Sequence, residues 1–282
     1  MTAAATTMSV WVDGIGILGP GIDNWPQAAA VLRGQAPYAQ AATVLPAPAI
    51  LPPAERRRAS RVIKASIAVG LEAAHMAGQD VAQLPNVFAS SGGDGHNCHA
   101  LCELLAGEDR QVSPTRFHNS VHNAASGYWA IATGATPPAQ VLGVHDASFA
   151  AGLFEAMVQV KTWNQPVLLV AADSEYPEPL HAKRPIADTS GIALVLSPVQ
   201  TAHSVGELRL NPADYLRAGA APALQAAGLD ALAAVSLQLP PWRGLPLLAA
   251  LAGATIAPVP LALPWLPGQV LQLSVQALAQ NT

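Results

Sequence analysis

The chain has 282 residues, of which 51% are hydrophobic and only 11% charged, and its formal net charge is -4 at pH 7. This length can bury one large apolar core or two smaller ones. The low charge and mild acidity argue against nucleic-acid binding, which needs clustered lysine and arginine side chains. The one basic run, ERRRASR at 55–61, begins a predicted helix. We interpret it as a solvated helix face rather than a phosphate site, and an acidic carrier protein stays open as its partner.

The cysteine content, the N-terminal residues and the apolar C-terminal segment indicate the cellular compartment and whether the chain enters a membrane. Cys98 and Cys102 are the only cysteines, which excludes a disulfide framework. The N-terminal residues lack a basic run followed by a long apolar run, so we expect no signal peptide and a cytoplasmic protein. After Arg243 the chain carries no charge, but prolines interrupt its apolar residues too often for a membrane-spanning helix. We expect buried strands and loops there, or a surface covered by a partner, and no membrane insertion.

Strands and helices alternate over the first two thirds of the chain. The first strand ends in glycines, and the helix after it has Asn24 as its N-cap and Gly34 as its stop. An extended Pro- and Ala-rich connection leads to one long amphipathic helix over 54–78. The alternation predicts an α/β fold with a mixed sheet covered by helices on both faces. The buried strands are expected at Ser9–Gly14, Asn86–Ser90, Gln140–Val144, Pro166–Ala171 and Ile192–Ser197.

Beyond Pro198 the composition shifts to alanine, leucine and proline. One helix is expected over Pro212–Gly228. Apolar runs such as Ala234–Leu239 and Gln269–Val275 follow it.

Residues Val141–Met157, VLGVHDASFAAGLFEAM, predict a buried strand, a tight turn and a helix. Many acyl-transfer enzymes place their nucleophile at such a turn, because the helix dipole and free backbone N–H groups stabilise a thiolate or an oxyanion. Here the first helical position is Phe149, whose side chain can do no chemistry.

Two glycine-rich turns, GIGILGPG and SSGGDGHNCH, match neither the dinucleotide fingerprint nor the phosphate-binding P-loop, so we expect no cofactor. Histidines and cysteines near the second turn could ligate zinc only if they converged, and no acidic ligand or second CxxC accompanies them. We therefore expect no metal site. The residues concerned are His96, Cys98, His99, Cys102, His118 and His122.

Two side chains could act as nucleophiles. Cys98 lies at a predicted helix start beside His96, and Ser148 lies in the turn beside His145 and Asp146. Neighbours in sequence are seldom catalytic partners in space, because the base must reach the nucleophile from another element. We favour an inert cysteine and turn-forming polar residues, and keep both nucleophiles as the alternative.

Five stretches, taken in order, resemble β-ketoacyl synthases of the thiolase superfamily. They are Val10–Gln35, Val87–Asn97, Val112–Ala135, His145–Met157 and Lys183–Pro198. The third is most similar to chain-length-factor subunits. The resemblance covers roughly residues 8 to 200 and implies a thiolase-like mixed sheet in a single domain, 1–282. Residues 1–200 would form the N-terminal half of that fold and residues 201–282 a shortened C-terminal part.

Departures from the family decide the expected function. The nucleophilic cysteine of the synthases aligns with Phe149, and their two catalytic histidines lie in C-terminal motifs, whereas the last histidine here is His203. The resemblance therefore implies no catalytic residues. It implies a silent, chain-length-factor-like subunit in fatty-acid or polyketide biosynthesis, most similar to the small aryl-polyene subunits. The alternative is an autonomous thiolase-fold acyltransferase or hydrolase that uses Cys98 or Ser148.

The implied partner is an active β-ketoacyl synthase in a heterodimer, or a second copy in a homodimer, with acyl carrier protein contacted indirectly. We expect Ser113–Trp129 at the subunit interface, because it mixes apolar and polar side chains as interfaces do. Some of its side chains would close the partner's acyl tunnel. The candidates are Phe117, His118, Ser120, Val121, His122, Tyr128 and Trp129.

Overall fold

A single mixed sheet runs through the chain in the computed structural model, which describes residues 7–108, 110–222, 224, 228–253 and 257–279. The strand order is β3-β2-β4-β5-β1-β6-β9-β7, with β8 paired to β9. The strands are β1 (Met8–Leu18), β2 (Asn86–Ala89), β3 (Ala139–Leu142), β4 (Val167–Asp173), β5 (Ser190–Ser197), β6 (Gly206–Leu210), β7 (Leu216–Ala218), β8 (Val259–Pro264) and β9 (Gln269–Ala277).

Strand direction changes across the sheet. β2 is parallel to both β3 and β4, and every other strand pair is antiparallel. The five strands expected from the sequence are all present, with boundaries that differ by a few residues. β3 was expected to be buried, but it is exposed or half-buried because it is the edge strand of the sheet. The predicted α/β class with a mixed sheet is thus confirmed.

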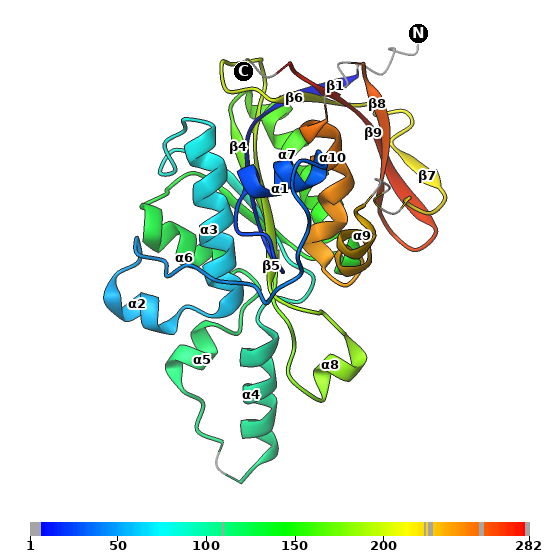
Figure 1. Ribbon diagram of the computed structural model, residues 1–282. Helices are drawn as coiled ribbons and strands as arrows, with labels where there is room; N and C mark the ends of the chain where they lie inside the picture. Colours follow the sequence, from blue (N-terminus) through cyan, green and yellow to red (C-terminus); the bar gives the residue numbers. More distant parts are fainter. Residues whose placement is uncertain (1–6, 109, 223, 225–227, 254–256, 280–282) are drawn as a thin grey trace.

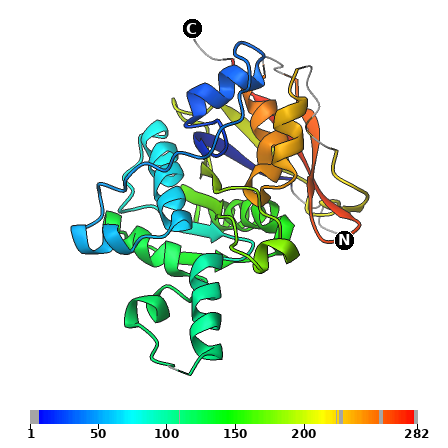
Figure 2. The same cartoon turned by 60° about the horizontal axis from the view of Figure 1, so that its bottom comes forward.

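Helices cover both faces of the sheet (Figure 1). α3 and α6 lie on one face, and α7, α1 and α10 lie on the other (Figures 1 and 2). α4 and α5 project away from the sheet (Figure 2). None of the described helices is both long enough and apolar enough to cross a membrane. The helices are α1 (Trp25–Leu32), α2 (Pro53–Arg58), α3 (Arg61–Met76), α4 (Gly95–Ala106), α5 (Pro114–His118), α6 (Ala124–Thr133), α7 (Ser148–Trp163), α8 (Leu180–Lys183), α9 (Asp230–Ser236) and α10 (Leu245–Ala252), with 3-10 turns η1 (His145–Ala147) and η2 (Pro240–Gly244).

Alternate residues of the central strands enter two separate apolar cores. In β4, Val167, Leu169 and Ala171 pack with α7, whereas Leu168 and Val170 pack with α3. Successive side chains of a strand point to opposite faces, so a strand buried on both sides reads as a continuous apolar run. The central strands could therefore be predicted from their continuous apolar runs.

Three local expectations were wrong. The long helix over 54–78 is two helices, because Ala59 has an extended ψ of 119° that separates α2 from α3. Strand β7 lies within the helix expected over 212–228, whose residues 223 and 225–227 fall outside the described residues. Helix α10 lies in the segment where buried strands and loops were expected. An all-apolar segment has no 2- or 3.6-residue period to separate strand from helix, and Pro246 is tolerated in the first turn of α10.

The backbone of α3 lies directly on β1. A Cβ atom built on Gly14 would lie 2.0 Å from the carbonyl oxygen of Ala73, and one on Gly16 would lie 2.0 Å from that of Val69. No side chain larger than hydrogen fits at such distances. The two glycines of β1 therefore set the separation between the sheet and this helix.

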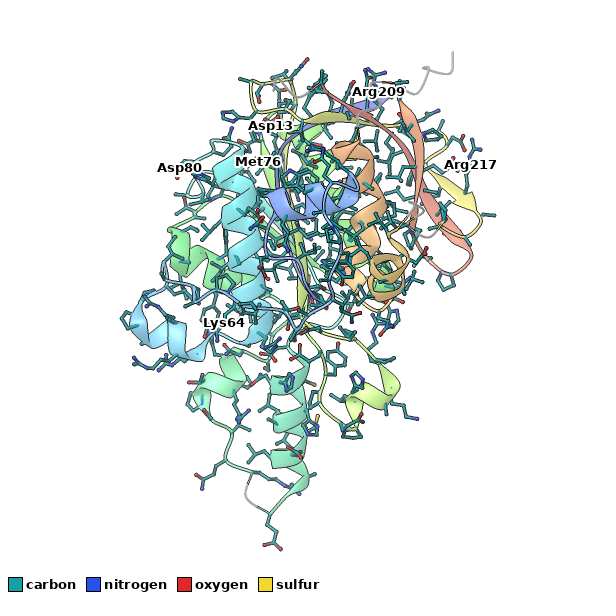
Figure 3. All side chains as sticks on the ribbon, in the orientation of Figure 1. Asp13, Lys64, Met76, Asp80, Arg209 and Arg217 are labelled. Atoms are coloured by element: carbon teal, nitrogen blue, oxygen red, sulfur yellow. The ribbon has the colours of Figure 1, made fainter. Side chains whose placement is uncertain are left out.

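Beyond Val12, where the pairing with β6 ends, side chains of α3 accept hydrogen bonds from the edge of β1 that faces away from β5. Met76 Sδ accepts from the N–H of Ile15 at 3.3 Å, and Glu72 Oε2 accepts from the N–H of Ile17 at 3.0 Å (Figure 3 labels Met76). Glu72 Oε1 also accepts from the N–H of Trp25 at 2.6 Å, at the start of α1. Burial raises the pKa of Glu72, although these backbone hydrogen bonds act to lower it. One half-buried carboxyl thus joins β1, α1 and α3.

We predict that Gly16→Ala lowers the free energy of unfolding by about 1–3 kcal/mol or more, because its methyl group would overlap the Val69 carbonyl. The matched control is Gly127→Ala on α6, where no atom lies within 4 Å of the added Cβ. The control should be neutral or up to about 1 kcal/mol more stable. Denaturant unfolding of both variants measures this, and equal stabilities would contradict the close contact.

Candidate functional site

The turn that the sequence marks as a nucleophile position is filled by an aromatic ring. η1 ends at Ala147, α7 begins at Ser148, and Phe149 follows with 1% of its surface exposed. A Cβ atom built on Gly244 would lie 2.5 Å from the ring of Phe149. The C-terminal turn η2 therefore packs directly onto Phe149, and only glycine at 244 permits this. The position aligned with the synthase nucleophile belongs to the core.

Ser148 serves the turn rather than a reaction. Its Oγ accepts from the N–H of Val144 at 2.9 Å and donates to the carbonyl of His145 at 2.7 Å. Its side chain is buried, and no imidazole ring among the described residues hydrogen-bonds to it. A serine whose proton is held by a carbonyl has no general base to activate it.

Asp146 is held between two arginines that come from distant parts of the chain. Its carboxylate accepts from Arg184 at 2.6 Å and from Arg243 at 3.0 Å. Burial alone would raise the pKa of Asp146, but the hydrogen bond from Arg184 and the charge of Arg243 lower it below the usual value. The cluster connects the turn to the segment after α8 and to η2.

A cavity of about 950 Å³ opens beside this cluster. Residues 144–147 form one wall, and Trp242, Arg243 and Trp265 contribute to the others. The remaining walls are mainly proline, alanine and leucine, and Phe149 is not part of them. The cavity therefore offers an apolar, aromatic space with an ion cluster at its edge, but no nucleophile paired with a base.

The second candidate nucleophile lies far from this cavity. Cys98 is exposed on the projecting helix α4. Local desolvation and the neighbouring Cys102 raise the pKa of the Cys98 thiol, which disfavours the reactive thiolate. No three His, Cys, Asp or Glu side chains of the described segments converge as metal ligands. His96 instead faces Glu175 at 3.7 Å, and His99 faces Glu103 at 3.2 Å.

The expected interface segment divides into a surface part and a core part. Phe117 is 69% exposed and Val121 is 51% exposed, which is unusual for such large apolar side chains. His118, Ser120 and His122 are also exposed.

Tyr128 and Trp129 instead lie fully inside the chain, so they cannot offer surface to a partner in this structure. Trp129 packs on Phe88, and a Cβ on Gly70 would lie 2.8 Å from its ring. Helical spacing did not show which face of α6 is buried. The interface prediction therefore reduces to Phe117, His118, Ser120, Val121 and His122, for which it stays a prediction.

Sequence reasoning missed Asp173, at the end of β4. Its buried carboxylate accepts hydrogen bonds from Ser90 Oγ at 2.8 Å, from Ser91 N–H and Oγ at 2.9 Å, and from Gly92 N–H at 3.3 Å. Burial raises its pKa, although these hydrogen bonds act to lower it. Asp173 holds the glycine turn that leads into α4. An acid after a buried strand, beside a parallel strand with a polar glycine turn, is the signal that could have indicated it.

We predict that Asp146→Asn destabilises the chain in a pH-dependent way. A carboxyl whose pKa is lowered on folding stabilises the native state above its unfolded pKa, usually 3.8, and loses this effect as the pH falls through the folded pKa. The stability difference between wild type and variant should therefore be full near neutral pH and shrink below about pH 4. Asp23→Asn, at an exposed carboxylate without an ion-pair partner in the described residues, is the control. Urea unfolding across pH measures both, and a difference that persists at low pH would contradict the ion cluster.

Comparison with known proteins agrees with the resemblance. The profile of the β-ketoacyl synthase N-terminal domain matches residues 24–237. The structure of a ketosynthase (ApeO) in complex with its chain length factor (ApeC) from Xenorhabdus doucetiae superposes with a TM-score of 0.65 at 20% identity, over 95% of this chain and 99% of that chain. The ishigamide ketosynthase/chain length factor superposes with a TM-score of 0.67 at 16% identity, over 96% of this chain and 100% of that chain.

A third structure, AntDE:AntF, is described as a type II polyketide synthase acyl carrier protein in complex with its ketosynthase bound to the hexaketide. It superposes with a TM-score of 0.69 at 10% identity, over 97% of this chain and 100% of that chain. At such identities the likeness shows the fold alone. A search of curated proteins finds no significant match. Because the profile spans most of the sequence, the chain belongs to the β-ketoacyl synthase N-terminal domain family, and it has the thiolase-like α/β fold of that family.

Proposed function

We propose that this chain is a non-condensing member of its family that pairs with an active β-ketoacyl synthase and helps to set product length, as a chain length factor would. The observation that carries the proposal is the burial of Phe149 beneath Gly244, at the position aligned with the nucleophile. Acyl transfer by this family needs a nucleophilic side chain at that turn and a base beside it. The pathway would be fatty-acid or polyketide biosynthesis, of the aryl-polyene type, in the cytoplasm.

A surface for the partner is available on the described residues. Phe117 and Val121 expose apolar area beside His118 and His122. Beside this surface, the void lined by Val121, His122 and Phe88 has a volume of only about 20 Å³. A partner's acyl chain that reached this surface would therefore meet a closed wall. This supports a role in ending the tunnel rather than extending it.

The exposed edge of the sheet supports the same location. β3 is the terminal strand on this side, and its residues are exposed or half-buried. An unpaired strand edge is a common site of association between chains. The partner in the proposal is a full-length active synthase, and a second copy of this chain would be the homodimeric form. Acyl carrier protein would reach the complex mainly through the active subunit.

The first prediction is that the purified chain neither condenses nor hydrolyses acyl thioesters when supplied with malonyl and acyl carrier proteins. Phe149→Cys should not restore turnover, because the side chain at 149 is buried and a thiol there would be closed off from an acyl thioester. An active synthase in the same assay is the positive control. Turnover that disappears in Cys98→Ala or Ser148→Ala would contradict the proposal and establish an autonomous acyltransferase or hydrolase.

The second prediction concerns product length in the complex with an active synthase. Phe117→Ala and Val121→Ala should lengthen the products, because each removes bulk from the wall that would end the acyl tunnel. Val199→Ala is the matched control, since Val199 is also an exposed valine but lies after β5. Mass spectrometry gives the product lengths, and co-purification shows that the complex is intact. Unchanged lengths in an intact complex would refute the gating role.

A further inference from the structure

β8 forms a second free edge of the sheet, at the end opposite β3. Its residues pair with β9, and no other strand in the described part of the chain pairs with it. The far side of β9 is already taken by β6 and β7. In Figure 1, β8 lies beside β9 on the side of the molecule away from α3 and α6. The outer edge of β8 is therefore open to a strand of another chain.

The two C-terminal strands themselves carry no charge. A free strand edge offers unpaired N–H and C=O groups, and proteins commonly guard such an edge with charged side chains. No charged residue follows Arg243 in the sequence, and Arg209 and Arg217 lie on β6 and β7, beyond β9 (Figure 3). The edge also exposes apolar surface, since Val259 is 38% exposed. An edge of this composition needs another form of protection against pairing with other chains.

The hydrogen bonds to β9 fix which residues of β8 point outward. The N–H of Trp265, directly after β8, donates to the carbonyl of Gln269 at 3.1 Å. In an antiparallel pair, residues whose backbone groups point to the partner strand alternate with residues whose groups point away. The residues that point to β9 are therefore Val259, Leu261 and Leu263. The residues whose backbone groups point outward are Pro260, Ala262 and Pro264.

Proline occupies two of these three outward positions. Proline has no N–H to donate, and its ring fills the space where the carbonyl of an incoming strand would lie. Pro260 and Pro264 cost the pairing with β9 no hydrogen bond, because their positions face away from it. Only the N–H of Ala262 is left as an outward donor. The outer edge of β8 therefore cannot form a regular ladder with another strand.

The two ends of the sheet differ in this respect. β3, the terminal strand at the other end, contains no proline. Its outward backbone groups can therefore both donate and accept. One end of the sheet can add a strand, whereas the other end is blocked.

We propose that Pro260 and Pro264 close the β8 edge to strand addition, and so prevent a second copy of this chain from pairing with it. Two copies aligned antiparallel along β8 would need donors at 260 and 264 on both chains, and all of these donors are missing. The prolines thus do for this uncharged segment what charged side chains do at other edges. The closed edge acts whether or not the chain pairs with a synthase, so the proposal does not rest on that function.

Amide hydrogen exchange of the wild-type chain, followed by NMR, tests the direction of the backbone groups. The amide of Ala262 should exchange about tenfold faster or more than the amides of Leu261 and Leu263, because only the latter two donate to β9. Equal protection of the three amides would overturn the outward orientation, and with it the proposal.

The double variant Pro260→Ala, Pro264→Ala tests the closure itself by restoring both donors. Alanine has less apolar surface than proline, so any added association cannot come from added apolar area. Sedimentation velocity of the full chain alone should show concentration-dependent species of about twice the wild-type mass, and the amide of Ala262 should become protected as they form. Pro37→Ala, at an exposed proline outside the sheet, is the matched control and should leave the mass unchanged.

Melting curves show whether each variant is folded. Each single variant restores one donor and should associate to an intermediate extent, so the test does not depend on the double variant alone. The proposal is overturned if the double variant and both single variants keep the wild-type mass at every concentration. It is equally overturned if they associate while the amide of Ala262 stays unprotected. Because no synthase is present, these outcomes are separate from success or failure of the proposed pairing.

Discussion

The rest of the structure depends on the contact between the backbone of α3 and Gly14 and Gly16 of β1. A Cβ atom built on either glycine would lie only 2.0 Å from a carbonyl oxygen of α3, so the backbones of helix and strand are in close contact. This closeness lets Met76 and Glu72 reach the N–H groups of β1 that no strand satisfies. It also fixes where α3 begins, and so where α2, α4 and α5 meet beside it (Figure 1).

Glycines also allow close packing at the turn before α7, where each of them lies against an aromatic ring. Trp242 stands where a Cβ on Gly19 would lie 2.2 Å from its ring, and its Nε1 donates to the carbonyl of Leu18 at 3.1 Å. Two residues later Gly244 accepts the ring of Phe149. The short turn η2 thus joins the end of β1 to the start of α7. The aromatic side chain at 149 and the glycine at 244 are complementary in shape. A reactive side chain at 149 would also be covered by η2.

Acidic groups are few in this chain, and several of the buried or half-buried ones organise backbone or hydroxyl groups rather than react. Asp173 orders the glycine turn before α4. Asp13, at a bulge of β1, accepts from Ser197 Oγ at 2.5 Å and Ser204 Oγ at 2.6 Å. Glu72 joins two elements through their N–H groups. Each carboxylate replaces its lost hydration with donors fixed by the fold, which is how a buried acid is tolerated.

By itself, the sequence determined the fold class and the strands up to residue 197, because strands buried on both faces are continuous apolar runs bounded by glycines and prolines. It also showed that a phenylalanine, Phe149, follows the strand-to-helix turn, because the residue at each position is read directly from the sequence. It could not assign the segment after 198, where alanine, leucine and proline show no regular period: β7 lies in an expected helix, and α10 lies where strands and loops were expected. Tertiary structure alone decided which side chains meet. It buried Tyr128 and Trp129 while exposing Phe117, and it joined Asp146 to Arg184 and Arg243 across the chain. Such contacts depend on the packing of elements far apart in the chain, and no local pattern of residues contains that information.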